Sequence, residues 1–190
     1  MKSFLKDDLN EILSLYPEFK NCKIFVETGT FKGGTVKEMS PFFEKIYTVE
    51  YSERLYTELK KINLPVNIES HRNNSEDFLK KILPSLKGQK IIFFLDAHWA
   101  GIETGFYQED CPLLKELKVI KENCNDNLII IDDYNKFETV RQKNHYRDAR
   151  HTKVFGKNGK IEDWKDITLD NVLKITGKEH YKILNNRLII

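Results

Sequence analysis

Short apolar runs alternate along the chain with longer segments in which apolar residues recur every three or four positions. The short runs predict strands, and the longer segments predict amphipathic helices. The expected strands are residues 24–27, 46–51, 65–70, 91–96 and 128–132, and the expected helices are residues 4–15, 53–61, 75–83 and 112–123, with one more ending near residue 40. Because strands that alternate with helices connect through right-handed crossovers, the pattern predicts a doubly wound α/β fold around a mostly parallel sheet.

The last thirty residues follow a different pattern. Residues 169–175 predict a final helix that Gly177 ends, and two short runs, at 181–184 and 187–190, follow it. Between these runs lies Asn185-Asn186, a pair typical of a two-residue hairpin turn. The sequence therefore predicts that an antiparallel hairpin closes the sheet.

Length and composition place these elements in one domain. The 190 residues carry a formal net charge of +2, with acidic and basic residues well mixed. One hydrophobic core suits this length. We expect a single domain over residues 1–190, with an N-terminal helix inside residues 1–20 and an irregular, basic segment at residues 136–160. A nucleic-acid partner is not expected, because such proteins concentrate basic charge on one face.

The cysteines and the apolar runs bear on the cellular compartment. Cys22, Cys111 and Cys124 are odd in number and form no Cys-x-x-Cys pair, so neither a disulfide framework nor a zinc site is indicated. The N-terminus has no apolar signal core, and the longest apolar runs are too short to span a bilayer. We therefore expect a cytoplasmic protein without a membrane partner.

A glycine-rich loop follows the first expected strand, with the pattern Glu27-x-Gly29-x-x-x-Gly33-Gly34. Gly29 allows a sharp turn, and Gly33 allows a ligand and the next helix to approach the backbone closely. Glu50 ends the second expected strand, where a carboxylate can accept hydrogen bonds from ribose hydroxyls. The spacing indicates an adenosine-type cofactor. The alternative is a glycine turn that serves only strand–helix packing.

The spacing of the loop separates the candidate cofactors. A dinucleotide site needs Gly-x-Gly-x-x-Gly, and its pyrophosphate-approach glycine falls on the bulky Phe31. A phosphate-binding Walker A loop is also missing. S-adenosylmethionine has no phosphate and tolerates the longer loop, so it is the favoured cofactor. The remaining alternatives are an NAD-dependent or nucleotide-sugar enzyme that uses the same adenosine-binding half, and a non-catalytic binding domain.

Three aspartates end the fourth and fifth expected strands, namely Asp96, Asp132 and Asp133. Because neighbouring parallel strands end at the same edge of a sheet, we expect these carboxylates to hold one Mg²⁺ ion. Such an ion lowers the pKa of an acceptor hydroxyl, and His98 can take the proton. The alternatives are helix capping or ion pairing for the aspartates, and an orienting or structural role for His98.

These motifs resemble those of the class I S-adenosylmethionine-dependent methyltransferases, over nearly the whole chain. The resemblance rests on Glu27-x-Gly29-x-x-x-Gly33, Glu50, Asn74-Ser75, Leu95-Asp96-Ala97-His98-Trp99 and Ile131-Asp132-Asp133-Tyr134. It implies a Rossmann-like sheet of seven strands. It also implies that Asn74 and Ser75 lie by the adenine, and that the cofactor is held by Glu27, Gly29, Thr30, Gly33, Glu50 and Asp96.

Within this family, the Asp-Ala-His-Trp and Asp-Asp motifs resemble small metal-dependent O-methyltransferases that act on sugars and natural products. The resemblance implies methyl transfer to a hydroxyl of a small acceptor, a sugar or glycan unit, with His98 and Asp96 as catalytic residues. Residues 101–110 are a candidate lid, and the basic segment at 136–160 is either a contact for a phosphorylated acceptor or a solvated flap. The sequence leaves open whether the protein forms a homo-oligomer.

Overall fold

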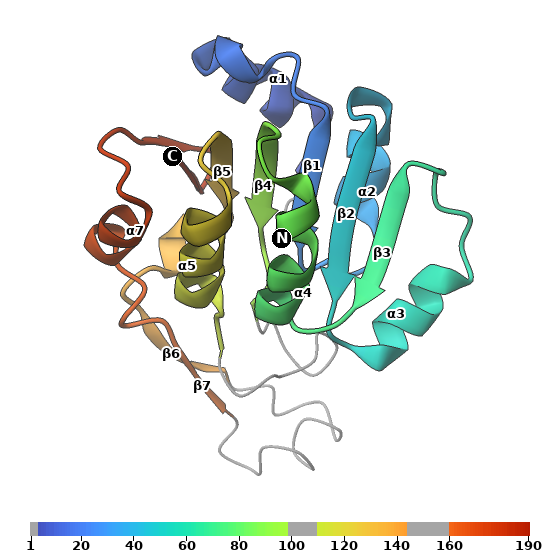
Figure 1. Ribbon diagram of the computed structural model, residues 1–190. Coiled ribbons are helices and arrows are strands. Elements are labelled where there is room, and N and C mark those ends of the chain that lie inside the picture. The colour runs from blue at the N-terminus through green and yellow to red at the C-terminus, as the bar shows by residue number, and fades with distance from the viewer. Residues whose placement is uncertain (1–3, 99–109, 144–159) are drawn as a thin grey trace.

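The computed structural model describes residues 4–98, 110–143 and 160–190. Within these residues, seven strands form one sheet in the order β3-β2-β1-β4-β5-β9-β8 (Figure 1). In chain order they are β1 (Ile24–Thr28), β2 (Lys45–Glu50), β3 (Ile68–Arg72), β4 (Ile91–Leu95), β5 (Asn127–Ile131), β8 (Lys182–Leu184) and β9 (Arg187–Ile189).

The sheet confirms the predicted fold class. All pairs among β1 to β5 are parallel, whereas β9 runs antiparallel to both β5 and β8. Asn185 and Asn186 turn the hairpin with φ values of 50° and 65°, the left-handed conformation that a two-residue hairpin requires. The order reverses between β1 and β4, so the carboxyl ends of these strands flank the crevice where ligands bind in such sheets.

Helices cover both faces of the sheet. They are α1 (Lys6–Leu15), α2 (Gly34–Met39), α3 (Glu53–Lys60), α4 (Ser75–Ile82), α5 (Leu113–Asn123) and α7 (Leu169–Thr176), with short 3₁₀ turns η1 (Pro17–Phe19), η2 (Ser40–Phe42), η3 (Leu83–Leu86) and η4 (Tyr134–Lys136). Figure 1 shows α4 and α5 in front of the sheet, with α2 behind it. Ser52 caps α3, because its side chain accepts the backbone N–H of Leu55.

The core has two halves, one on each face of the sheet. Val26 and Phe93 pack with α4, α5 and α7, whereas Phe25 and Phe94 pack with α1 and α2. Successive strand residues point to opposite faces, so both halves draw on the same strands. This explains why β4 is apolar at every position: each of its residues is buried.

The predicted start of the third strand needs correction. β3 begins at Ile68 and not at residue 65, because Pro65 has no N–H for the ladder and its carbonyl instead accepts the N–H of Ile68 in a turn. Asn74 caps α4, since its Oδ1 accepts the N–H of Asp77 at 2.9 Å. Ser75 is the first residue of that helix and is buried.

The segment expected to be irregular contains a strand. β6 (Val140–Lys143) pairs antiparallel with β7 (Lys160–Asp163) in a separate two-stranded sheet. Its sequence, Val-Arg-Gln-Lys, lacks the apolar alternation that marks a half-buried strand, so no pattern predicted it. The predicted lid at 101–110 lies outside the described residues apart from Asp110, and so do residues 144–159 of the basic segment.

Candidate functional site

The glycine loop lies directly against the end of β4. Gly29 has φ +88°, and a Cβ built on it would lie 2.5 Å from the carbonyl oxygen of Asp96. Gly33, at the start of α2, has φ +75°, and its Cβ would lie 2.8 Å from Cδ1 of Leu59. The Asp96 backbone therefore requires a glycine at position 29, and the left-handed φ favours one at position 33. The cofactor role of Gly29 and Gly33 stays a prediction.

Glu50 ties this loop to the end of β2. One of its carboxylate oxygens accepts the N–H of Phe31 at 2.8 Å, and the other accepts the N–H of Ser52 at 2.7 Å. Burial raises the pKa of Glu50, although these backbone hydrogen bonds oppose the rise. Phe31 itself has φ 50°, so the chain adopts a glycine-like conformation at a phenylalanine.

Glu27 lies beneath the loop and is only 2% exposed. Its carboxyl accepts the Thr48 hydroxyl at 2.6 Å, and that hydroxyl lies 2.6 Å from the Thr30 hydroxyl. Burial, with smaller contributions from the charges of Asp96 and Glu50, raises the pKa of Glu27 to about 8. Glu27 is therefore mostly protonated near neutral pH.

The turn after β3 lies against the same edge of the sheet. The N–H of Asn73 donates to the carbonyl oxygen of Glu50 at 3.3 Å, which brings Asn74 and Ser75 near the loop. The side chain of Asn74 is engaged in capping α4, where its Nδ2 also donates to Asp77 at 2.8 Å. The predicted contact of Asn74 and Ser75 with adenine stays a prediction.

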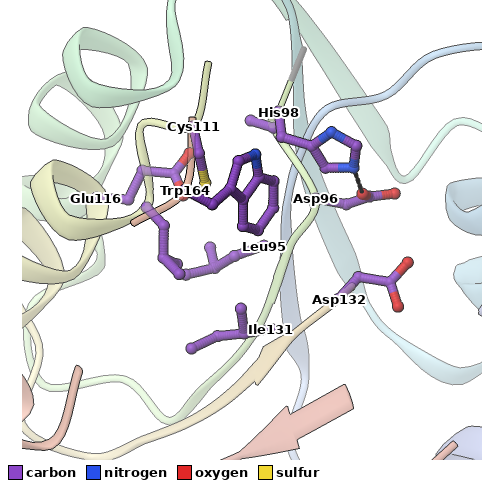
Figure 2. A pocket seen from close by; sticks show the side chains of 10 residues that line it. Leu95, Asp96, His98, Cys111, Glu116, Ile131, Asp132 and Trp164 are labelled. Carbon is purple, nitrogen blue, oxygen red and sulfur yellow. Dashed lines mark ion pairs between the residues drawn. The ribbon is translucent and has the colours of Figure 1, made fainter. Parts of the chain in front are cut away.

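Two of the three predicted metal ligands come together with His98. Its Nε2 lies 3.2 Å from Asp96 Oδ1 and 2.9 Å from Asp133 Oδ2. Figure 2 shows the imidazole directed toward Asp96. Burial opposes a charge on the ring, but hydrogen bonds to Asp133 and Asp96 outweigh it and raise the pKa of His98 to about 9. The ring is therefore charged near neutral pH, which favours an orienting role for His98 over that of a base.

Asp132 is engaged elsewhere. Its Oδ1 lies 3.1 Å from Nε of the buried Arg187, whose Nη1 lies 3.2 Å from Asp8 of α1. Burial and the charge of Asp96 raise the pKa of Asp132 to about 6, although Arg187 opposes the rise. The expected set of Asp96, Asp132 and Asp133 is therefore not assembled among the described residues, because the fold supplies Asp132 with an arginine that no sequence pattern marked.

Three further residues enclose the site. Lys136 Nζ lies 2.6 Å from Asp133 Oδ2 and 3.6 Å from Glu162 Oε1, and it lies 5.2 Å from the ring centroid of Trp164. The Trp164 ring meets His98 edge-on at 5.3 Å, and its indole N–H has no hydrogen-bond partner among the described residues. No sequence pattern pointed to these three residues, because Lys136 lies in a run of basic residues and Glu162 and Trp164 belong to no motif.

A small pocket opens at the ends of β4 and β5 (Figure 2). Its wall includes Asp96, His98, Asp132, Glu116 and Trp164. Carboxylates and an imidazole thus share the wall of this pocket with apolar side chains such as Leu95, Leu113 and Ile131, and Asp96 joins the pocket to the glycine loop. Trp99, the last residue of the Asp-Ala-His-Trp motif, lies outside the described residues.

The fit of a divalent ion can be tested on the donor atoms. Asp96, His98 and Asp133 each offer one atom, all within 4.8 Å of one another. The imidazole makes this set less suited to Mg²⁺ than the all-oxygen set expected from the sequence. In addition, the ammonium of Lys136 already contacts Asp133. The arrangement as it stands does not fit Mg²⁺.

Comparison with known proteins bears on the fold. No protein-family model and no curated protein sequence matches the chain. Among solved structures, a proposed caffeoyl-CoA O-methyltransferase from Staphylococcus aureus is 14% identical over 99% of this chain and 83% of its own, with a TM-score of 0.56. Precorrin 8w decarboxylase from Methanobacterium thermoautotrophicum is 13% identical over 100% of this chain and 90% of its own, with a TM-score of 0.51.

A third structure widens the range of activities. Spermidine synthase from Thermotoga maritima is 12% identical over 95% of this chain and 57% of its own, with a TM-score of 0.56. The chain has the class I methyltransferase fold, which confirms the fold that the motifs implied. Because these three proteins carry different activities, the activity of this chain must be argued from its site. None of the described helices has the length and apolar character needed to cross a membrane.

Proposed function

We propose that this protein is an S-adenosylmethionine-dependent O-methyltransferase. The observation that carries the proposal is the close approach of the glycine loop to the end of β4, where Gly29 leaves no room for a side chain beside Asp96. This approach puts the cofactor loop and the polar group of Asp96 and His98 at one edge of the sheet. A donor methyl group at the loop would then face the pocket that those residues line.

The binding part of the proposal rests on Glu50 and Phe31. Glu50 is held at the end of β2 by the backbone N–H groups of Phe31, Ser52 and Tyr51. A carboxylate has about four lone-pair sites, so it can accept a ribose hydroxyl in addition. Phe31 stands where a dinucleotide site requires the close approach of a pyrophosphate. S-adenosylmethionine needs no such approach, so the loop favours it over NAD or a nucleotide-linked sugar.

The proposed reaction is an in-line displacement. An acceptor oxygen forms a bond to the methyl carbon, the carbon–sulfur bond breaks, and its electron pair stays on sulfur, giving neutral S-adenosylhomocysteine. The hydroxyl proton passes to a base. His98 can accept it only in its neutral form, which a pKa of about 9 makes the minor form at neutral pH. Charged His98 would instead donate a hydrogen bond that orients the acceptor.

The proposed acceptor class is supported by the polar residues of the pocket wall. The carboxylates of Asp96 and Asp132 can accept hydrogen bonds, which suits a small molecule with several hydroxyls. A sugar or glycan unit carries such hydroxyls. A divalent ion belongs to this proposal only if Lys136 leaves Asp133, and no step above depends on one.

Calorimetric titration tests the proposal. The wild type should bind S-adenosylmethionine far more tightly than NAD⁺ or UDP-glucose. Glu50→Gln should weaken this binding, whereas the control Glu44→Gln should not, because Glu44 is an exposed partner of Lys23 away from the loop. A folded protein that does not bind S-adenosylmethionine at millimolar concentration, or that prefers NAD⁺, contradicts the proposal. Transfer of a labelled methyl group to hydroxylated sugars then tests the acceptor class.

A further inference from the structure

Lys136 occupies an unusual position for a lysine in a basic, polar segment. Its side chain is only 13% exposed, and its ammonium lies 2.6 Å from Asp133 Oδ2. It also lies 3.3 Å from both ring nitrogens of His98 and 3.6 Å from Glu162, which is 2% exposed. A lysine is rarely enclosed in this way unless its charge is paired.

Local backbone geometry holds the lysine there. Asp133 has φ 56°, and the 3₁₀ turn that follows it brings Lys136 back over the Asp133 carboxylate. The N–H of Lys136 donates to the Asp133 carbonyl oxygen at 2.8 Å. Trp164 lies on the other side, where its backbone N–H donates to the carbonyl oxygen of Thr139 at 2.8 Å. The ammonium is thus placed by the fold and is not a chance surface contact.

The donor atoms that could hold a divalent ion surround the same point. Asp96, His98 and Asp133 lie within 4.8 Å of one another, and Lys136 contacts two of the three. An ion bound to Asp133 Oδ2 would lie about 2 Å from that oxygen, within a few ångströms of the ammonium. Repulsion between the two cations in this enclosed site opposes such binding.

We propose that the ammonium of Lys136 takes the place of a divalent ion on Asp133. Metal binding by Asp96, His98 and Asp133 then requires the loss of the lysine charge. If the proposed methyl transfer holds, it proceeds in the presence of a chelator, and only this consequence rests on the proposed function.

Titration with Mn²⁺ alone, followed by the electron paramagnetic resonance signal of the free ion, tests the proposal. Lys136→Met keeps the aliphatic stem against Trp164 and removes the charge. It should bind Mn²⁺ about a hundredfold more tightly than the wild type, or more. Lys136→Arg, which keeps the charge, should behave as the wild type does. Lys165→Met should do so too, because Lys165 is an exposed lysine paired with Asp163.

Two further variants locate the ion. Adding Asp96→Asn to Lys136→Met should abolish the gained affinity, which assigns it to this group. Equal Mn²⁺ affinity in the wild type and Lys136→Met overturns the proposal. If that variant does not fold, Lys136→Gln replaces it. The proposal is also overturned if the wild type, with Lys136 in place, binds Mn²⁺ saturably and Asp133→Asn abolishes that binding. Because no methyl donor or acceptor is present, the result is independent of the proposed activity.

Discussion

Glu27 offers a direct test of how the site is charged before any ligand binds. Replacing it with glutamine keeps an oxygen that can accept the Thr48 hydroxyl and removes the ionisable group. In the folded protein the pKa of Glu27 rises from 4.5 to about 8, chiefly because of burial. At a pH between these two values, Glu27 therefore keeps its proton in the folded state and has lost it in the unfolded state.

The sign and size of the effect follow from this difference. Below about pH 4.5 the carboxyl is protonated in both states, so its ionisation does not lower the free energy of unfolding. Between the two pKa values the unfolded state binds fewer protons, so the free energy of unfolding falls as the pH rises, and above about pH 8 the loss is complete. At about 1.4 kcal/mol for each tenfold change in proton affinity, the full loss is on the order of 5 kcal/mol.

Urea unfolding of both proteins at several values between pH 5 and pH 9 measures this loss. Other groups titrate alike in both proteins, so the difference in the free energy of unfolding isolates Glu27. The stability of Glu27→Gln should rise relative to the wild type by several kcal/mol over this range. Glu44→Gln, at an exposed position, should show no comparable trend. A constant difference between pH 5 and pH 9 means that Glu27 is ionised in the folded protein and refutes the reasoning.

Three further predictions concern the loop and the polar group. Gly29→Ala should destabilise the chain by about 2 kcal/mol or more, because its Cβ would overlap the Asp96 carbonyl in a left-handed conformation; a thermal melt like that of the wild type would contradict this. Phe31→Gly should be about 1 kcal/mol more stable to urea than Phe31→Ala, since only the alanine retains the strain of φ 50°. Equal unfolding midpoints of these two variants would mean that the backbone at position 31 is not strained. If His98 is the base, the methyl-transfer rate should increase as the pH rises through about 9, where the ring loses its proton, and a flat profile from pH 7 to 10 would exclude that role.

Sequence periodicity was sufficient for the architecture. Strands β1, β2, β4 and β5 are largely buried, so apolar runs mark them, whereas the half-exposed β3 has no such run. Asn185-Asn186 marks the hairpin. The same pattern predicted that Glu27, Glu50 and Asp96 lie at the carboxyl ends of neighbouring strands. Parallel strands that are joined by helices must end at the same edge of the sheet, so the order of elements is enough to bring these residues to one edge. Strand β6 was missed because its polar sequence has no such periodicity.

Only the tertiary structure decided which charged groups meet. Asp132 and Asp133 are adjacent in sequence, yet Asp132 pairs with Arg187 and Asp133 pairs with His98 and Lys136. The hairpin brings Arg187 back to β5 from more than fifty residues away, and the left-handed backbone at Asp133 turns the lysine inward. Ion pairing depends on distances of a few ångströms and on burial. These are properties of the packed chain, and local sequence patterns do not encode them.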